Sequence, residues 1–137
     1  MNELAAYENK LTIGCFNFDK TGLVVNGDPT FEEWKKCGEF LKQAEKSVQF
    51  WIGDWLNYGE HRWGEMYTQA IEITGQEYKT VRNEKWVSSK IELSRRRDNL
   101  SFSHHAEVAQ LEPEEQDYWL DKAEEEGLSR NELRKAI

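Results

Sequence analysis

The sequence predicts a mainly α-helical fold preceded by a short N-terminal β-hairpin. After Thr30, apolar side chains recur at the three- and four-residue spacing that places them on one face of a helix. Helix start and stop signals, including two capping boxes, punctuate the same region. Before Pro29, apolar residues instead form short runs around a turn sequence. We expect a flexible arm and hairpin over residues 1–29 and one multi-helix domain over residues 30–137.

The hairpin follows an arm formed by the first ten residues. Leu11 to Phe18 is predicted as one strand, Asp19 to Gly22 as the turn, and Leu23 to Val25 as the second strand. Asn26-Gly27-Asp28-Pro29 then ends the hairpin. An isolated hairpin is marginally stable in water, so we expect it to pack on the helices or to pair with a second copy.

Two helices are predicted to form the core. Thr30 and Glu33 make a capping box that starts the first, whose inward face carries Trp34, Cys37, Leu41, Ala44 and Val48. The second takes in residues 50–56, where Trp51 pairs with Trp55 and Ile52 with Leu56. With Trp119, the tryptophans of these helices are interpreted as core residues rather than as a surface for stacking bases.

Five shorter helices are predicted to follow. The first spans about residues 64–74 with Met66, Ala70 and Ile73 inward, and the second spans 78–89 with Tyr78, Val81, Trp86 and Val87 packing. A short helix covers 101–110. Pro113 and Gly127 bracket the next, whose Gln116, Trp119, Leu120 and Ala123 share a face. Ser129 and Glu132 form a second capping box and open the last helix.

Composition excludes several classes of protein. No apolar run approaches the length of a membrane span, and the N-terminus lacks the pattern of a secretion signal, so we expect a cytoplasmic protein with no membrane partner. Cys15 and Cys37 have no metal-binding spacing and are predicted to be buried reduced thiols. No carboxylate pair, activated nucleophile or phosphate loop stands out. We therefore expect no catalytic residue, metal or cofactor.

A tightly turned pair of helices around Thr74 to Ser88 carries the candidate functional residues. Ala70 lets the two helices approach, Gly75 suits a left-handed turn, and Val81 supplies an apolar anchor. The other face of the second helix carries side chains that bind base edges and phosphates in DNA complexes: Lys79, Thr80, Arg82, Asn83 and Lys85. As a pattern alone, this fits DNA binding and an ordinary solvated basic helix about equally well.

Charge is strongly segregated along the chain. The net charge of −8 by itself disfavours a nucleic-acid partner. Between Tyr78 and Arg97, however, seven basic residues face two acidic ones, a balance of +5, whereas residues 112–126 hold eight acidic residues and only Lys122, a balance of −7. We therefore expect separate basic and acidic faces, with the acidic helix 112–126 directed away from DNA.

Motifs in order resemble the LmbU-type transcriptional regulators. They are Trp51-Ile52-Gly53-Asp54-Trp55-Leu56-Asn57-Tyr58-Gly59-Glu60, Tyr78-Lys79-Thr80-Val81-Arg82-Asn83 with Trp86-Val87, and the segment from Leu93 to Ala109 containing Arg95-Arg96-Arg97 and His104-His105. The same stretch is more remotely similar to the helix-turn-helix domain of the ParB and KorB partition proteins, through His105, Glu114-Glu115-Gln116 and Leu128 to Leu133. Both resemblances imply sequence-specific binding to double-stranded DNA as a homodimer. Glu84-Lys85 departs from the regulators' pattern and implies a different target sequence.

The predicted DNA contacts extend beyond the recognition helix. Arg95, Arg96 and Arg97 are interpreted as a phosphate clamp, in preference to a solvated loop, and Ser101 and His104 as further phosphate contacts at a helix start. Adjacent histidines on a helix point about 100° apart and cannot share one ion, so His104-His105 is not interpreted as a metal site.

An alternative of another class stays open. A protein-protein adaptor of phage or plasmid type would keep this fold without DNA affinity. A nucleic-acid-processing enzyme would need clustered acidic metal ligands, which the sequence does not offer. In the DNA-binding interpretation, the acidic helix 112–126 is expected to contact the transcription machinery or another protein.

Overall fold

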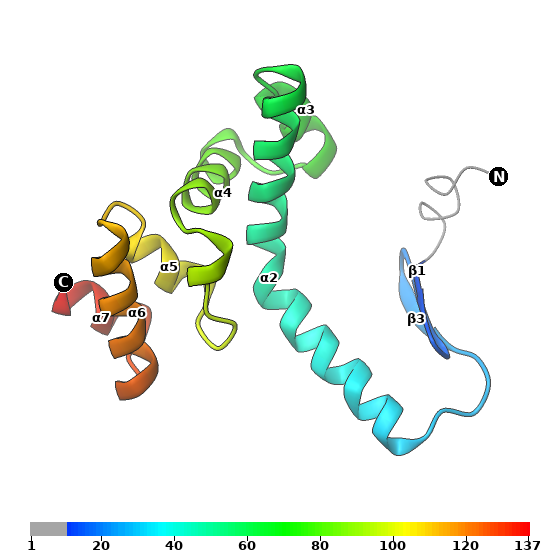
Figure 1. The fold of residues 1–137 in the computed structure, drawn as a ribbon. Helices are drawn as coiled ribbons and strands as arrows, with labels where there is room; N and C mark the ends of the chain where they lie inside the picture. The colour runs from blue at the N-terminus through cyan, green and yellow to red at the C-terminus, as the bar shows by residue number, and fades with distance from the viewer. Residues whose placement is uncertain (1–10) are drawn as a thin grey trace. The chain divides into compact units, whose positions relative to one another are not determined.

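A computed structural model of the protein describes residues 11–137, and the predicted arm over residues 1–10 lies outside them (Figure 1). The chain divides after Lys42 into two compact units, residues 1–42 and 43–137. Within residues 11–137 no helix is both long and apolar enough to cross a membrane.

The N-terminal unit contains a three-stranded antiparallel sheet instead of a two-stranded hairpin. Strands β1 (Leu11–Ile13), β2 (Phe16–Asp19) and β3 (Gly22–Val25) lie in the order β1-β2-β3. The prediction of one strand from Leu11 to Phe18 is wrong, because the chain turns at Gly14 and Cys15. Gly14 has a φ of 57°, a left-handed conformation that glycine adopts without strain. The turn between β2 and β3 falls where predicted.

One long helix replaces the two that were predicted. Helix α2 runs from Phe31 to Trp63 and begins at the expected capping box, in which the Thr30 and Glu33 side chains each accept a hydrogen bond from the other's backbone N–H. No proline interrupts residues 31–63, so nothing in the backbone chemistry ends the helix between Val48 and Phe50. Near Val48 the apolar residues move to another face of the same helix, and no new helix begins there.

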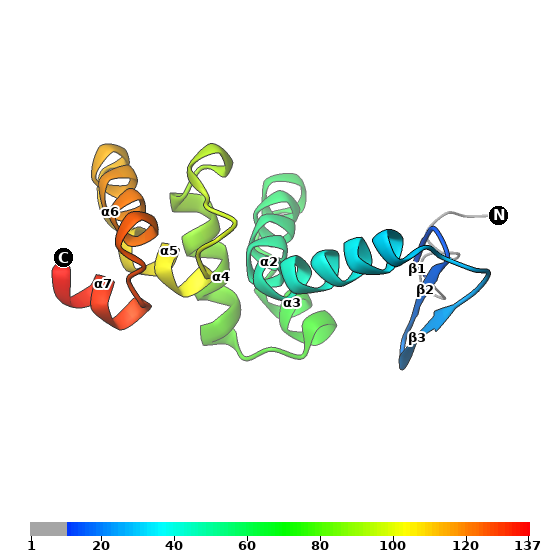
Figure 2. The same ribbon diagram turned by 90° about the horizontal axis from the view of Figure 1, so that it is seen from below.

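The main core of the second unit, over residues 43–137, draws on one turn of α2 and on the helices that follow. These are α4 (Tyr78–Lys90), α5 (Phe102–Val108), α6 (Pro113–Glu126) and α7 (Arg130–Ala136), whereas the 3-10 turn η1 (Leu93–Arg95) between α4 and α5 buries no residue. The buried side chains that hold them together are Phe50, Val87, Ile91, Leu100, Phe102, Val108, Ala109, Leu120, Ala123 and Leu133. Figure 2 shows α5 beside α6 and α7, and residues of α5 contact both.

A second, smaller cluster fixes α3 (Tyr67–Thr74) against its neighbours. It consists of Leu56, Ala70 and Val81, one residue each from α2, α3 and α4. The sequence correctly identified Ala70 and Val81 as the contacts of this helix pair. Ile73 was expected inward but is 70% exposed, and Ile71 packs against the cluster instead.

Several large side chains expected in the core are exposed. Trp34, Trp51 and Trp55 lie at the surface, whereas Trp119 is partly buried against the main core. On α4, Tyr78 and Trp86 are exposed while Val81 and Val87 are buried as predicted. Cys15 and Cys37 are free thiols, only partly buried.

The last two helices follow their sequence signals closely. Pro113 occupies the first turn of α6, and Gly127 ends that helix in the left-handed conformation with a φ of 63°. Ser129 and Glu132 form the predicted capping box of α7. Local backbone chemistry alone determines these boundaries, which explains why the sequence shows them.

Candidate nucleic-acid interface

Helices α3 and α4 are joined by a turn of three residues, 75–77. Gly75 has a φ of 74°, and its N–H donates to the carbonyl oxygen of Ile71 at 2.9 Å, which ends α3. Thr74 accepts at Oγ1 from the Gln76 N–H at 3.2 Å, which steadies the turn. The sequence around Gly75 therefore folds locally as predicted, into two helices with a tight connection.

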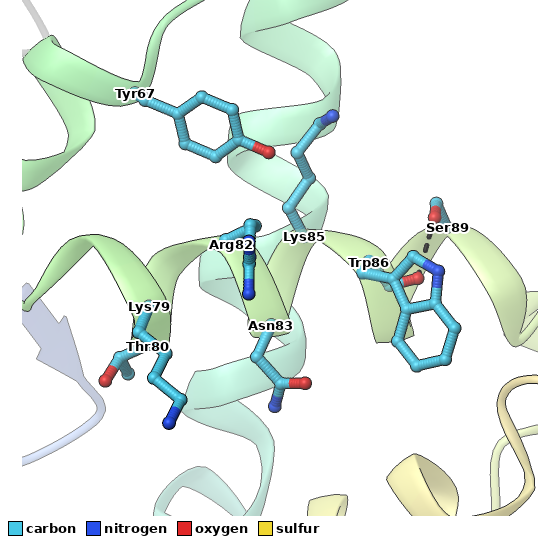
Figure 3. A pocket seen from close by; sticks show the side chains of 8 residues that line it. All are labelled: Tyr67, Lys79, Thr80, Arg82, Asn83, Lys85, Trp86 and Ser89. Carbon is cyan, nitrogen blue, oxygen red and sulfur yellow. Dashed lines mark hydrogen bonds between the residues drawn. The ribbon is translucent and has the colours of Figure 1, made fainter.

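The first two turns of α4 present a polar face to solvent. Lys79, Thr80, Arg82 and Asn83 are all exposed, and Val81 on the opposite side is buried. The four exposed residues line an open concavity, and Figure 3 shows how their side chains lie around it. The concavity has a volume of about 610 Å³. Among the described residues, none forms an ion pair or side-chain hydrogen bond with Lys79, Thr80 or Asn83, and Arg82 lies 5.7 Å from the centre of the Tyr78 ring. This polar face is free to meet a partner.

The concavity is also lined by three residues that the sequence analysis did not assign to the site. They are Tyr67 from α3, and Trp86 and Ser89 from α4. Trp86 follows Lys79 by seven residues, two helical turns, so the helical periodicity of α4 would have placed it on the same face. Tyr67 comes from another helix, and only the fold brings it near.

Lys85 is engaged within the protein. Its Nζ lies 2.8 Å from a carboxylate oxygen of Glu60 on α2, and 5.5 Å from the centre of the Tyr67 ring. The hydrogen bond to Glu60 is the main cause that raises the pKa of Lys85. Lys85 thus ties α4 to α2 and α3 at the edge of the concavity.

Arg96 is also held by the fold. Its guanidinium makes a two-pronged contact with Asp54 of α2, at 2.7 and 2.9 Å, and donates to the carbonyl oxygens of Ser88 at 2.9 Å and Ile91 at 3.0 Å. The same group lies 4.3 Å from the centre of the Phe50 ring. These contacts join α2 to the end of α4.

Arg95 and Arg97 contact the acidic helix. Arg95 binds Asp117 at 3.3 Å and Glu92 at 2.9 Å. Arg97 contacts three carboxylates of α6: Asp117, Asp121 and Glu124. The expected separation into a basic and an acidic face is therefore wrong at this point, because the three consecutive arginines neutralise acidic side chains of α2 and α6.

Ser101 and His104 form the cap of α5. Ser101 Oγ accepts from the His104 N–H at 3.2 Å, and the His104 ring contacts Ser101 through Nδ1 and the carbonyl oxygen of Leu128 through Nε2, at 2.8 Å. His105 is fully buried: its Nδ1 donates to the Ser101 carbonyl oxygen at 2.7 Å and its Nε2 accepts from the Arg97 N–H at 2.9 Å. Desolvation lowers the pKa of His105 to about 4, so the ring is neutral near pH 7.

Glu84 lies on the inner side of α4. It is 1% exposed, and burial raises the pKa of its carboxyl group above the ordinary value. Gln76 donates to one of its oxygens at 3.3 Å, and the other oxygen has no partner within residues 11–137. Glu84 therefore faces away from the polar face of α4 and is not placed to contact a partner there.

These features define a mainly helical protein in which two tightly connected helices present one polar, cationic helix face to solvent. The chain is similar to the transcriptional regulator NovE of Streptomyces niveus, with 45% identity over 119 residues that cover 87% of this chain and 55% of NovE. The chain thus spans about half the length of that relative. No protein-family model matches the chain, and no solved structure matches it.

Proposed function

We propose that the protein is a transcription regulator that binds duplex DNA sequence-specifically through α4, in the manner of a ParB/KorB-like helix-turn-helix. The observation that carries this proposal is the free polar face of α4, formed by Lys79, Thr80, Arg82 and Asn83 on a short, rigidly held helix. The similarity to a protein named as a transcriptional regulator supports the regulatory role.

The chemistry of this face matches the major groove of DNA. Arg82 offers the two-pronged donor geometry that guanine accepts, and Asn83 has the donor and acceptor pair that adenine requires. Lys79 and Thr80 can bind the adjacent phosphates. All four residues lie near the N-terminal end of α4, the part of a recognition helix that ordinarily contacts base edges.

We propose fewer direct DNA contacts than the sequence alone suggests. Lys85, Arg95, Arg96 and Arg97 already bind carboxylates of the same chain, so recruiting them to phosphate would break those ion pairs. Ser101 and His104 likewise use their side chains to cap α5. We therefore assign these six residues to holding the fold that presents α4, and restrict direct DNA contacts to the polar face of α4.

The proposed partners are a second copy of the chain and the transcription machinery. A two-fold dimer would place two α4 helices on the two halves of a symmetric DNA site. Asp117, Asp121 and Glu124 of α6 are occupied by arginines, whereas Glu112, Glu114 and Glu115 at its start are exposed. Glu125, near the end of α6, is exposed as well, so a contact with the transcription machinery would use these exposed carboxylates at the two ends of the helix.

Binding to the duplex upstream of the protein's own gene tests the proposal. We expect Arg82→Ala and Asn83→Ala each to weaken binding to the preferred duplex by roughly 1–3 kcal/mol and to reduce its preference over a scrambled duplex. Lys135→Ala, which removes an exposed cation from α7, is the matched control and should bind like the wild type. Unchanged affinity and preference in both α4 variants would contradict the assignment.

A protein-protein adaptor is the second candidate function. The internal pairing of Arg95, Arg96 and Arg97 favours it, because it leaves fewer free cations on a chain of net charge −8. The adaptor predicts no duplex binding at any salt concentration. The regulator predicts binding that weakens steeply as salt rises.

A further inference from the structure

An apolar surface runs along α2 and α3 in the C-terminal unit. We call it the aromatic face and define it by six exposed residues: Val48, Trp51, Trp55, Tyr58, Trp63 and Ile73. On α2, Val48, Trp51, Trp55 and Tyr58 follow one another at three- and four-residue spacing. Trp63 lies at the end of the same helix, and Ile73 is contributed by α3. Two concavities, of about 410 and 270 Å³, open on this surface and meet at Trp55 and Ile73, which line both. The face is therefore continuous.

The aromatic face exposes more apolar area than a solitary surface residue would. Trp63 is 66% exposed and Ile73 is 70% exposed. Because an aromatic side chain buries roughly 150–250 Å² when covered, the six residues together expose on the order of 600 Å². A contiguous apolar patch of this size ordinarily marks an interaction site.

We propose that the aromatic face is the surface through which two copies of this chain associate. Apposed by a two-fold axis, two such faces would bury on the order of 1,200 Å², the lower end of the range for specific interfaces. Contact between rim residues adds to this area. The face is thus large enough to hold a dimer without help from another surface.

Charge favours a second copy as the occupant. The protein carries a net charge of −8, so two copies repel each other wherever acidic surfaces meet. None of the residues lining the two concavities is charged. The aromatic face is therefore a surface on which the chain can meet itself without apposing like charges.

The sequence pattern supports the same occupant. The spacing of Trp51 and Trp55 is that of core residues, yet the chain itself leaves both exposed. A second copy would bury both side chains, as their core-like spacing predicts. The inference extends the proposed function by locating a dimer contact away from Lys79, Arg82 and Asn83, and it stands on different residues.

Sedimentation velocity of the 137-residue chain without DNA tests the proposal. We expect the wild type to sediment at twice the 16.2 kDa monomer mass at concentrations of about 10–100 μM, near which weak specific dimers form. Trp55→Glu and Ile73→Glu should each sediment as monomers, because a carboxylate would be desolvated at the contact. Leu93→Glu is the control, since Leu93 is 78% exposed outside the face, and this variant should stay dimeric.

Circular dichroism and thermal melting establish whether each variant is folded. The substituted positions are exposed, so each variant should keep the helix content of the wild type and unfold cooperatively, with a melting temperature lowered only by the loss of the dimer contact. A wild-type chain that remains monomeric, or face variants that dimerise as well as Leu93→Glu, would overturn the proposal. A dimer that fails to bind DNA would instead leave this inference standing and contradict the proposed function.

Discussion

His105 illustrates how a buried titratable residue couples the fold to pH. Both ring nitrogens are hydrogen-bonded within α5 and its preceding loop, and the ring packs edge-on against Phe50 with centroids 5.0 Å apart. Its pKa is about 4 in the folded chain, against an ordinary value of 6.5. Between these values the unfolded chain binds a proton that the folded chain does not. The stability of the fold therefore falls as the pH drops through this window.

Replacing His105 should remove that pH dependence. Between about pH 7.5 and pH 5, His105 is expected to lower the free energy of unfolding of the wild type by about 2 kcal/mol, and His105→Gln should lack this part of the decrease. Glu84, whose raised pKa acts with the opposite sign, is present in both proteins and does not affect the difference. Urea denaturation at both pH values measures it. An equal decrease in the free energy of unfolding for the two proteins between these pH values would show that His105 does not titrate on unfolding.

Helices α2 and α4 approach each other closely at Gly53. A Cβ atom at this position would overlap Ser88 Oγ and the backbone carbonyl oxygen of Glu84. We expect Gly53→Ala to lower the free energy of unfolding by roughly 1–3 kcal/mol, because the backbone of α4 would have to move. Gly38→Ala in the same helix meets no atom within 4 Å and should not be destabilising. Equal melting temperatures for the two variants would contradict the close packing.

At the scale of elements, the arginines after α4 act as connectors. Arg96 joins α2, the end of α4 and the following turn through Asp54 and two backbone carbonyl oxygens. Removing its guanidinium leaves these acceptors without a partner in a partly buried place, so Arg96→Gln should lower the free energy of unfolding by roughly 1–3 kcal/mol. Lys90→Gln, at an exposed position of α4, should change it by less than about 0.5 kcal/mol. Chemical denaturation of the two variants checks this, and equal stabilities would restore the phosphate clamp as the better interpretation.

Element boundaries were predictable where local chemistry sets them. The caps at Thr30, Ser129, Pro113 and Gly127, and the turn at Gly75, all appear in the structure where the sequence indicates them. The continuity of α2 was not predictable from apolar periodicity, because one helix can present different faces along its length. Trp51 and Trp55 follow core spacing, yet the chain does not bury them. Only tertiary structure decides which apolar face is covered.

The charged residues of the whole molecule also include some whose role follows from local sequence and some whose role depends on tertiary structure. The exposure of Lys79, Thr80, Arg82 and Asn83 agrees with the site predicted from sequence, because helical periodicity around the buried Val81 determines it. The role of the three arginines could not be predicted, since all their carboxylate partners except Glu92, which pairs with Arg95, lie 20 or more residues away along the chain, as between Arg97 and Asp117. Summed charge over a sequence window overstates the basic surface when such long-range pairs form.

Duplex binding as a function of salt concentration tests most directly the central claim that the polar face of α4 meets DNA. The account predicts that the logarithm of the wild-type binding constant falls linearly with the logarithm of salt concentration. It also predicts that Lys79→Gln combined with Arg82→Gln makes the slope shallower by about 0.9 for each phosphate that the double variant no longer neutralises. A wild-type chain without affinity for duplex DNA at low salt, or a double variant with the wild-type slope and affinity, would contradict it.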